Sequence, residues 1–147
     1  MTSTALLTDM YELTMIKAAM HAGTAFRRCT FDLFPRRLHT GSSYGVVAGT
    51  GRALEALKHF RFGPEEIEFL RDRGIADDML AEWLADYKFS GNIRGYAEGE
   101  LFFSGSPVAV VEGSFAEAVV LETLLLSIFN HDSAVASAAS RMTLAAE

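Results

Sequence analysis

The segment Leu6–Met15 constrains the fold more than any other, because it marks where a helix begins and which polar groups lie at its end. Thr8 or Asp9 can cap that helix, since either side chain can accept a hydrogen bond from a free amide of the first turn. With Asp9 as the cap, Glu12 follows at capping-box spacing. Gly23 ends the helix. Apolar residues lie on nearly all of its sides and predict that it is buried: Met10, Leu13, Met15, Ile16, Ala18, Ala19 and Met20.

Extended and helical patterns alternate through the rest of the chain. Alternating β-branched, aromatic and polar residues predict strands at 29–34, 44–48, 91–97, 101–103 and 108–111. Caps and apolar faces predict helices at 52–59, 64–73, 79–84, 115–129 and 134–147. We expect Asn130–Ser133 to separate the last two helices, and the final alanine- and serine-rich helix to pack closely against its neighbours. The order of elements predicts an α+β fold in which a small antiparallel sheet or sandwich packs with helices.

Length and charge narrow the class of protein. A chain of 147 residues with half of them apolar can form one domain with a real core. A formal charge of −6 argues against nucleic-acid binding, which needs a basic surface. The single cysteine, Cys29, cannot form an internal disulfide, which fits a reduced, cytoplasmic compartment. We expect no signal peptide and no membrane span, because the longest apolar stretch, Phe115–Phe129, is short and contains acids.

Several short segments together resemble one enzyme family. Leu6–Met15 is similar to the amino terminus of nicotinate phosphoribosyltransferases, which opens with L-L-T-D-x-Y and a helix. Further segments match that family in the same order: Phe31–Arg37, Phe60–Phe62, Glu98–Gly99, Gly105–Pro107, Val111–Gly113, Glu122–Leu126 and Ala138–Met142. Each segment is weak alone, but the ordered set identifies the chain as a member, from Leu6 to its last residue.

The resemblance implies a fold and an extent. Residues 1–147 would form the N-terminal mixed domain of a type II phosphoribosyltransferase, whose first helices lead into a C-terminal α/β barrel that is mostly missing here. The family's enzymes are roughly three times this length, and the predicted last helix of this chain has no residue that stops it. We therefore expect the chain to be the front part of a longer protein.

The resemblance also implies a reaction. The full-length enzyme would form nicotinate mononucleotide from nicotinate and phosphoribosyl pyrophosphate with ATP hydrolysis and Mg²⁺, in the salvage branch of NAD biosynthesis. In the family the tyrosine of the opening motif stacks on the pyridine in the partner subunit's site, so Tyr11 would have that role in a homodimer, with Asp9 beside it. None of the four histidines matches the family's phosphorylated histidine. We expect no catalytic residue in this segment, and no turnover from the 147-residue chain alone.

Two arginines are candidate phosphate ligands, because a guanidinium group can bind two phosphate oxygens at once. Arg36 follows a strand, and in the family this region lies near the sugar diphosphate; a solvated basic turn explains Arg36 equally well and Arg37 better. Arg141 can pair with Asp132 or Glu147, or approach a substrate phosphate. The family often has a Thr-Lys pair shortly before its Ala-Ala-Arg segment, but this chain lacks the lysine, so no role is carried over to that position.

Other interpretations stay open at this stage. Nicotinamide phosphoribosyltransferases share the Asp-x-Tyr opening. The strands between residues 91 and 113 are also similar to small carrier or binding modules, although a carrier usually displays a lysine on a hairpin tip, where this chain has Glu98–Gly99 and Gly105–Ser106. His131 and Asp132 are adjacent and have no second His–acid cluster, so we expect no metal site.

Overall fold

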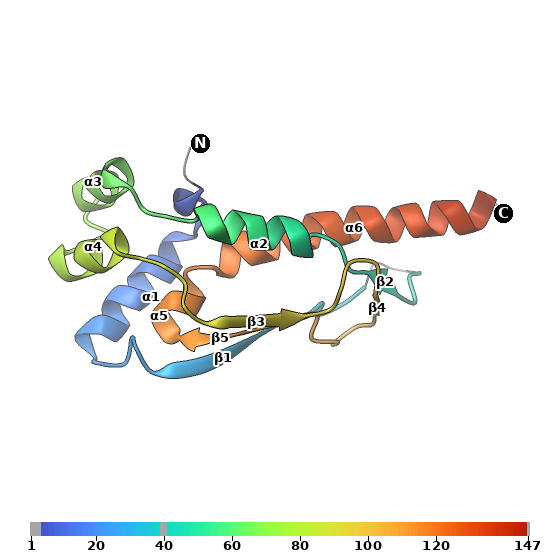
Figure 1. Cartoon of the computed structure of the whole chain (residues 1–147), viewed down its shortest axis with the longest axis horizontal. Coiled ribbons are helices and arrows are strands. Elements are labelled where there is room, and N and C mark those ends of the chain that lie inside the picture. The colour runs from blue at the N-terminus through green and yellow to red at the C-terminus, as the bar shows by residue number, and fades with distance from the viewer. Residues whose placement is uncertain (1–3, 39–40, 147) are drawn as a thin grey trace.

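Two antiparallel sheets and one long C-terminal helix organise the chain (Figure 1). The computed structural model describes residues 4–38 and 41–146. Its elements in chain order are a 3₁₀ turn Ala5–Leu7, α1 Met10–His21, β1 Arg28–Leu33, β2 Gly45–Val46, α2 Thr50–His59, α3 Pro64–Asp72, α4 Asp78–Ala85, β3 Asn92–Gly95, β4 Leu101–Phe102, β5 Ala109–Ser114, α5 Phe115–Val119 and α6 Glu122–Ala146.

The larger sheet has β5 in the centre, between β1 and β3. Both neighbours run antiparallel to it, and Val111 is paired with Phe31 on one side and with Ile93 on the other. Alternate residues of β5 are buried, as period-two side-chain alternation requires for a strand with one face on the core. The second sheet pairs β2 with β4 only. The predicted α+β fold with small antiparallel sheets is therefore confirmed.

Aromatic and aliphatic side chains fill the core between the sheet and the helices. Phe60 is fully buried, and its ring meets those of Phe62 and Tyr87 edge to face, with centroids 5.6 and 5.7 Å away. Helix α1 packs against α4 and α5, and it contributes Leu13 and Ile16 to this core. Helix α5 in turn contacts β5, so the first helix lies close to the sheet without pairing with it.

Helix α1 is buried on one face only, so the prediction of burial on nearly all sides is wrong. Met10, Tyr11 and Met15 are 63%, 44% and 42% exposed. The apolar residues of its opposite face are enough to anchor the helix. The second apolar face is left uncovered in this chain.

The predicted break at Asn130–Ser133 is also wrong. Helix α6 runs without interruption from Glu122 to Ala146, and the chain bends earlier, at Val120–Leu121. Polar residues at 132 and 133 suggested a cap, but their side chains bond to other elements. Asp132 accepts hydrogen bonds of 2.9 and 2.7 Å from Arg52. The Ser133 hydroxyl bonds to the Ala48 backbone at 3.1 and 3.2 Å.

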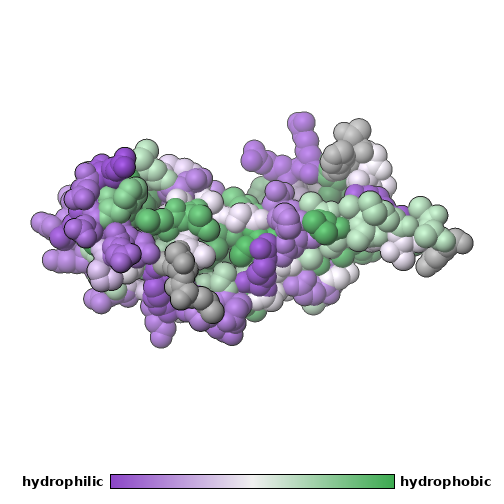
Figure 2. All heavy atoms as spheres, turned by 90° about the horizontal axis from the view of Figure 1, so that it is seen from above, coloured by the Kyte–Doolittle hydropathy of each residue, from purple (hydrophilic) through white to green (hydrophobic). Residues whose placement is uncertain are grey.

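The far end of α6 projects from the rest of the chain (Figure 1). Figure 2 shows that this projecting arm is largely hydrophobic, and Val135, Met142 and Leu144 are exposed on it. By length and composition alone, a window of Phe115–Ala146 could cross a bilayer. Half of that window is buried inside the fold, as in the core helix of many globular proteins.

Serines on α6 form hydrogen bonds with β2 and the residues that flank it. Ser137 accepts a 2.8 Å bond from the Val46 amide, and the Ser140 hydroxyl lies 3.3 Å from that of Tyr44. One edge of β2 pairs with β4, so these serines and Ser133 satisfy polar groups on its other side. The prediction that the small-residue helix packs closely is confirmed, because α6 contacts both β2 and α2.

Ser137→Ala should destabilise the fold, because it leaves the amide of Val46 without an acceptor beside a helix that excludes water. We expect a loss of about 1–3 kcal/mol in the free energy of unfolding, measured by urea denaturation. Ser127→Ala is the matched control, since the exposed Ser127 hydroxyl bonds only to Leu124 of its own helix. Equal stability of the two variants would contradict a role for Ser137 in holding β2.

Candidate functional site

Tyr11 lies in the first turn of α1, with its ring partly exposed and its phenol beside Glu122 at the start of α6. Partial burial, followed by a hydrogen bond and the charge of Glu122, raises the pKa of Tyr11 to about 12. The phenol therefore stays protonated at neutral pH and can donate to that carboxylate. The ring is not enclosed by its own chain, so one of its surfaces can contact another molecule.

Asp9 occupies the N-cap position of α1, as predicted, with an extended backbone. The predicted side-chain cap is wrong, because no side chain at this position accepts a hydrogen bond from the first turn. The Asp9 carboxylate is exposed, and its charge is a minor cause of the raised pKa of Tyr11. Asp9 therefore lies at the same helix start as Tyr11, and its role beside that ring stays a prediction.

Glu12 is the residue of this region that sequence reasoning placed wrongly. It forms no capping box with Asp9 and is instead fully buried. One carboxylate oxygen accepts bonds from the amide of Thr123 at 3.0 Å and from its hydroxyl at 2.5 Å, and the other accepts from the hydroxyl of Thr8. Burial raises the pKa of Glu12, although its hydrogen bonds act in the opposite direction. An acid on the otherwise apolar face of α1 was the available signal.

The raised pKa of Glu12 predicts a pH-dependent difference between Glu12→Gln and the unsubstituted chain. Above the ordinary pKa of 4.5, the unfolded chain loses this proton while the folded chain retains it. The unfolded state then binds fewer protons, so this group lowers the free energy of unfolding as pH rises, up to the raised pKa. Glutamine carries no such proton. Urea titrations from pH 4 to 7 should show the stability of Glu12→Gln rising relative to the unsubstituted chain; a constant difference would contradict this.

A groove of about 670 Å³, here called the arginine groove, lies between the end of β1, the segment before β2 and helix α6. Its lining combines apolar and polar side chains, among them Leu33, Phe102, Phe129, Tyr44, Arg37 and Arg141. Two guanidinium groups beside an apolar wall suit a ligand that carries both a flat apolar part and an anionic part.

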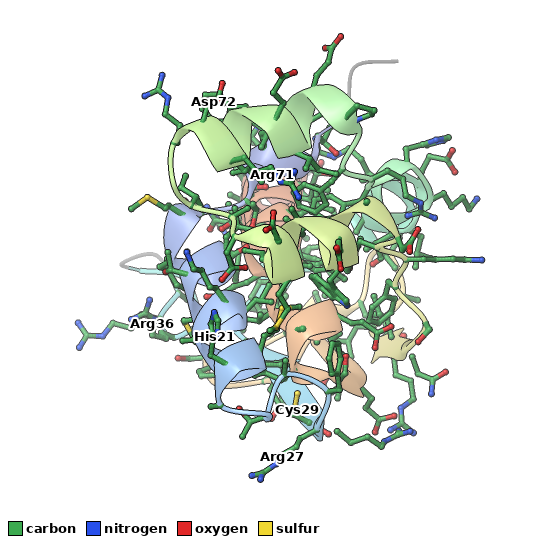
Figure 3. The ribbon with its side chains drawn as sticks, turned by 90° about the vertical axis from the view of Figure 1, so that its left-hand side faces the viewer. His21, Arg27, Cys29, Arg36, Arg71 and Asp72 are labelled. Carbon is green, nitrogen blue, oxygen red and sulfur yellow. The ribbon has the colours of Figure 1, made fainter. Side chains whose placement is uncertain are left out.

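The structure assigns different positions to the two candidate arginines, Arg36 and Arg141, and places Arg37 with the second of them. Arg37 and Arg141 line the arginine groove, whereas Arg36 does not, and its side chain extends away from the ribbon in Figure 3. The expected pairing of Arg141 with Asp132 is wrong, because Asp132 binds Arg52 and His131. Within residues 4–38 and 41–146, Arg141 forms no ion pair; the other suggested partner, Glu147, lies outside the described residues.

The predicted site residues are divided between the two ends of α6. Tyr11 meets Glu122 in the first turn of that helix, and Arg141 lies nineteen residues further along it. At about 1.5 Å of rise per residue, Glu122 and Arg141 are about 28 Å apart along the axis of α6. The groove itself reaches back along α6 to Leu126, one turn after Glu122, but Arg141 lies at its far end. Tyr11 and Arg141 of one chain are therefore too far apart to contact the same small molecule.

Other chemistry-bearing groups have structural partners. The described residues contain no cluster of three His, Cys, Asp or Glu side chains that could hold a metal ion. His131 does contact its neighbour Asp132, at 2.8 Å, and the pKa of Asp132 is lowered by that bond and by Arg52. Burial raises the pKa of the Cys29 thiol, which disfavours the reactive thiolate. Glu98 accepts amide bonds from the first residues around α2.

Solved structures share this fold. The crystal structure of human nicotinic acid phosphoribosyltransferase superimposes with a TM-score of 0.86 at 31% identity, over 93% of this chain and 28% of that one. A nicotinate-nucleotide pyrophosphorylase from Pyrococcus furiosus has a TM-score of 0.56 at 21% identity, which is a likeness of fold alone. The architecture is that of the N-terminal domain of type II phosphoribosyltransferases, as the resemblance implied.

Sequence comparisons narrow that class. A family model described as the nicotinate phosphoribosyltransferase N-terminal domain matches residues 6–130, and the chain belongs to this family. A nicotinate phosphoribosyltransferase of Mycobacterium tuberculosis is 60% identical over 141 residues, covering 96% of this chain and 31% of the relative. One from Bacillus subtilis is 35% identical over 95% of this chain and 29% of its own length. The chain thus spans about a third of the relatives it matches.

Proposed function

We propose that this chain is the N-terminal part of an enzyme that forms nicotinate mononucleotide from nicotinate and phosphoribosyl pyrophosphate. In that reaction the pyridine nitrogen bonds to the anomeric carbon of the ribose while the bond to the pyrophosphate oxygen breaks. The 60% identity to the M. tuberculosis relative across 96% of the chain is the observation that supports this most. Nicotinamide phosphoribosyltransferase and a non-catalytic module are not favoured, because these relatives are named for nicotinate.

Tyr11 would supply an aromatic face for the pyridine ring. Its ring is partly exposed and its phenol lies beside Glu122, so part of the ring is open to a ligand. Ring stacking contributes about 0.5–1.5 kcal/mol beyond the burial of area. Asp9, on the preceding turn, would hold a polar atom of the substrate or orient Tyr11.

The site would be shared between two copies of the chain. Tyr11 and Arg141 lie near opposite ends of α6, so a second copy is needed if both contact one substrate. The uncovered apolar residues Met10 and Met15 beside Tyr11 fit burial against that copy. A homodimer with shared sites therefore stays our prediction.

The arginines would bind the diphosphate of the sugar substrate. Arg141 lines the arginine groove together with Arg37, and two guanidinium groups can offset the charge that develops on the departing pyrophosphate. Arg36 remains a candidate on the same segment, although its side chain lies outside the groove. Its contribution would require a ligand that extends beyond the groove.

Mg²⁺ and ATP hydrolysis belong to the proposal for the whole enzyme. The described residues contain no acidic or histidine cluster suited to a metal ion, so no step proposed for this chain depends on a metal that it holds. A cytoplasmic location is likewise a prediction that follows from the reaction and from the absence of a disulfide partner for Cys29.

A chimera tests the proposed function. The chain is joined to the remaining two thirds of the M. tuberculosis relative in place of the matching 141 residues. We expect turnover with nicotinate and phosphoribosyl pyrophosphate, much weaker turnover with nicotinamide, and none from the 147-residue chain alone. Preference for nicotinamide would favour the runner-up enzyme, and a folded chimera without turnover would contradict the proposal.

A further inference from the structure

Two adjacent residues of α1 meet two adjacent residues of α6. The Tyr11 phenol bonds to Glu122, and the Glu12 carboxylate bonds to Thr123 through both its amide and its hydroxyl. These contacts join parts of the chain more than one hundred residues apart in sequence. Two consecutive residues at the start of α6 thus contact both side chains.

The two side chains of α1 point in different directions. Successive helical residues are about 100° apart around the axis, so an inward Glu12 leaves Tyr11 turned toward the surface. The exposures agree: Glu12 is fully buried, whereas Tyr11 is partly exposed. The orientation of the Tyr11 ring therefore depends on how firmly Glu12 fixes the rotation of the first turn of α1.

The surroundings of Glu12 make a rigid attachment. Its carboxylate accepts the Thr123 amide, one of the amides that the first turn of α6 cannot bond within the helix, and an acid is favoured at this positive helix end. Its other oxygen accepts from Thr8, whose hydroxyl also lies 3.2 Å from the carbonyl oxygen of Val120. Glu12 thus links the residues before α1 to the bend between α5 and α6.

We propose that Glu12 is a positioning residue for nicotinate binding: by bonding to Thr123 it fixes the first turn of α1 and so sets where Tyr11 presents its ring. The inference rests on the proposed function, because it assumes that Tyr11 contacts the pyridine. It assigns Glu12 no contact with substrate. Glu12 affects nicotinate binding only by setting the position of Tyr11.

Two substitutions at this position separate positioning from charge. Glu12→Ala removes the attachment. Glu12→Gln retains it, because the side-chain oxygen of the glutamine accepts both bonds from Thr123. The side-chain nitrogen of the glutamine then donates to the Thr8 hydroxyl oxygen, and that hydroxyl donates to the Val120 carbonyl. In the chimera we expect Glu12→Ala to raise the KM for nicotinate about threefold to tenfold, since small misplacements of a binding group are costly. The KM for phosphoribosyl pyrophosphate should stay unchanged, and Glu12→Gln should restore the nicotinate KM.

A control variant and a double variant exclude a purely structural role. Glu66→Ala removes the bond to the Gly63 amide, 2.9 Å long, at the start of α3, and so lowers stability away from α1 and Tyr11. It should leave the nicotinate KM unchanged. Adding Glu12→Ala to Tyr11→Ala should not raise the nicotinate KM further, because two substitutions that act through the same side chain are not additive.

The outcomes are distinct. Equal rises in both KM values, or full additivity with Tyr11→Ala, would overturn the positioning role of Glu12. If Glu12→Ala does not fold, Thr123→Val takes its place, since it removes the hydroxyl bond and keeps the amide bond. An unchanged nicotinate KM in that variant would overturn the inference as well. A nicotinate KM that does not respond to Tyr11→Ala itself would instead defeat the proposed role of Tyr11.

Discussion

Replacing Tyr11 with alanine in the chimera is expected to raise the KM for nicotinate more than about tenfold, because the variant loses both ring stacking and the buried area of an aromatic anchor. The ring is partly exposed in this chain, with its phenol beside Glu122, so a substrate can reach it. Steady-state kinetics with nicotinate varied at saturating phosphoribosyl pyrophosphate measure the effect.

Two further substitutions serve as controls. Tyr11→Phe keeps the stacking face and loses the hydroxyl beside Glu122, so the nicotinate KM should rise much less than in Tyr11→Ala. Met79→Ala removes a similarly exposed apolar side chain from α4, and the nicotinate KM should not change. If Tyr11→Ala behaves like Met79→Ala, the tyrosine has no place in the site.

Local patterns in the sequence predicted most of the elements. Local contacts define the starts of α4 and α5, since Asp77 accepts a bond from the Leu80 amide and Ser114 forms a capping box with Glu117. These contacts depend on residues three or four positions apart, so the sequence alone contains them. The polar residues at 132 and 133 suggested a helix break that is absent. Their partners, Arg52 and the Ala48 backbone, are 80 and 85 positions away in the chain, so the sequence alone does not reveal them.

In the candidate site, too, local features could be predicted from the sequence and long-range contacts could not. The resemblance singled out Tyr11 and Asp9, and the structure places both at the start of α1, where their roles stay a prediction. The sequence could not predict that Glu12 bonds to Thr123, because no local rule links residues 111 positions apart. Nor could it decide between Arg36 and Arg37, since only the path of the chain after β1 determines which of two adjacent side chains faces the groove.

Mixing two impaired chimeras should restore activity at low nicotinate concentration if the site is shared. One carries Tyr11→Ala and the other Arg141→Ala, which removes a guanidinium group from the arginine groove. In a mixed dimer with shared sites, both substitutions meet in one site and the other site is unaltered. Random reassociation of equal amounts gives mixed dimers in half of the population, so about a quarter of all sites recover.

The restored activity distinguishes a shared site from a site within one chain. If Tyr11 served its own subunit, each site of a mixed dimer would still carry one of the two substitutions and activity would stay at the level of the separate variants. Dissociation in mild denaturant followed by dilution allows exchange, and a mixture kept without denaturant is the control. The separation of Tyr11 and Arg141 by about 28 Å along α6 is the reason to expect recovery, because no single pyridine nucleotide spans both within one chain.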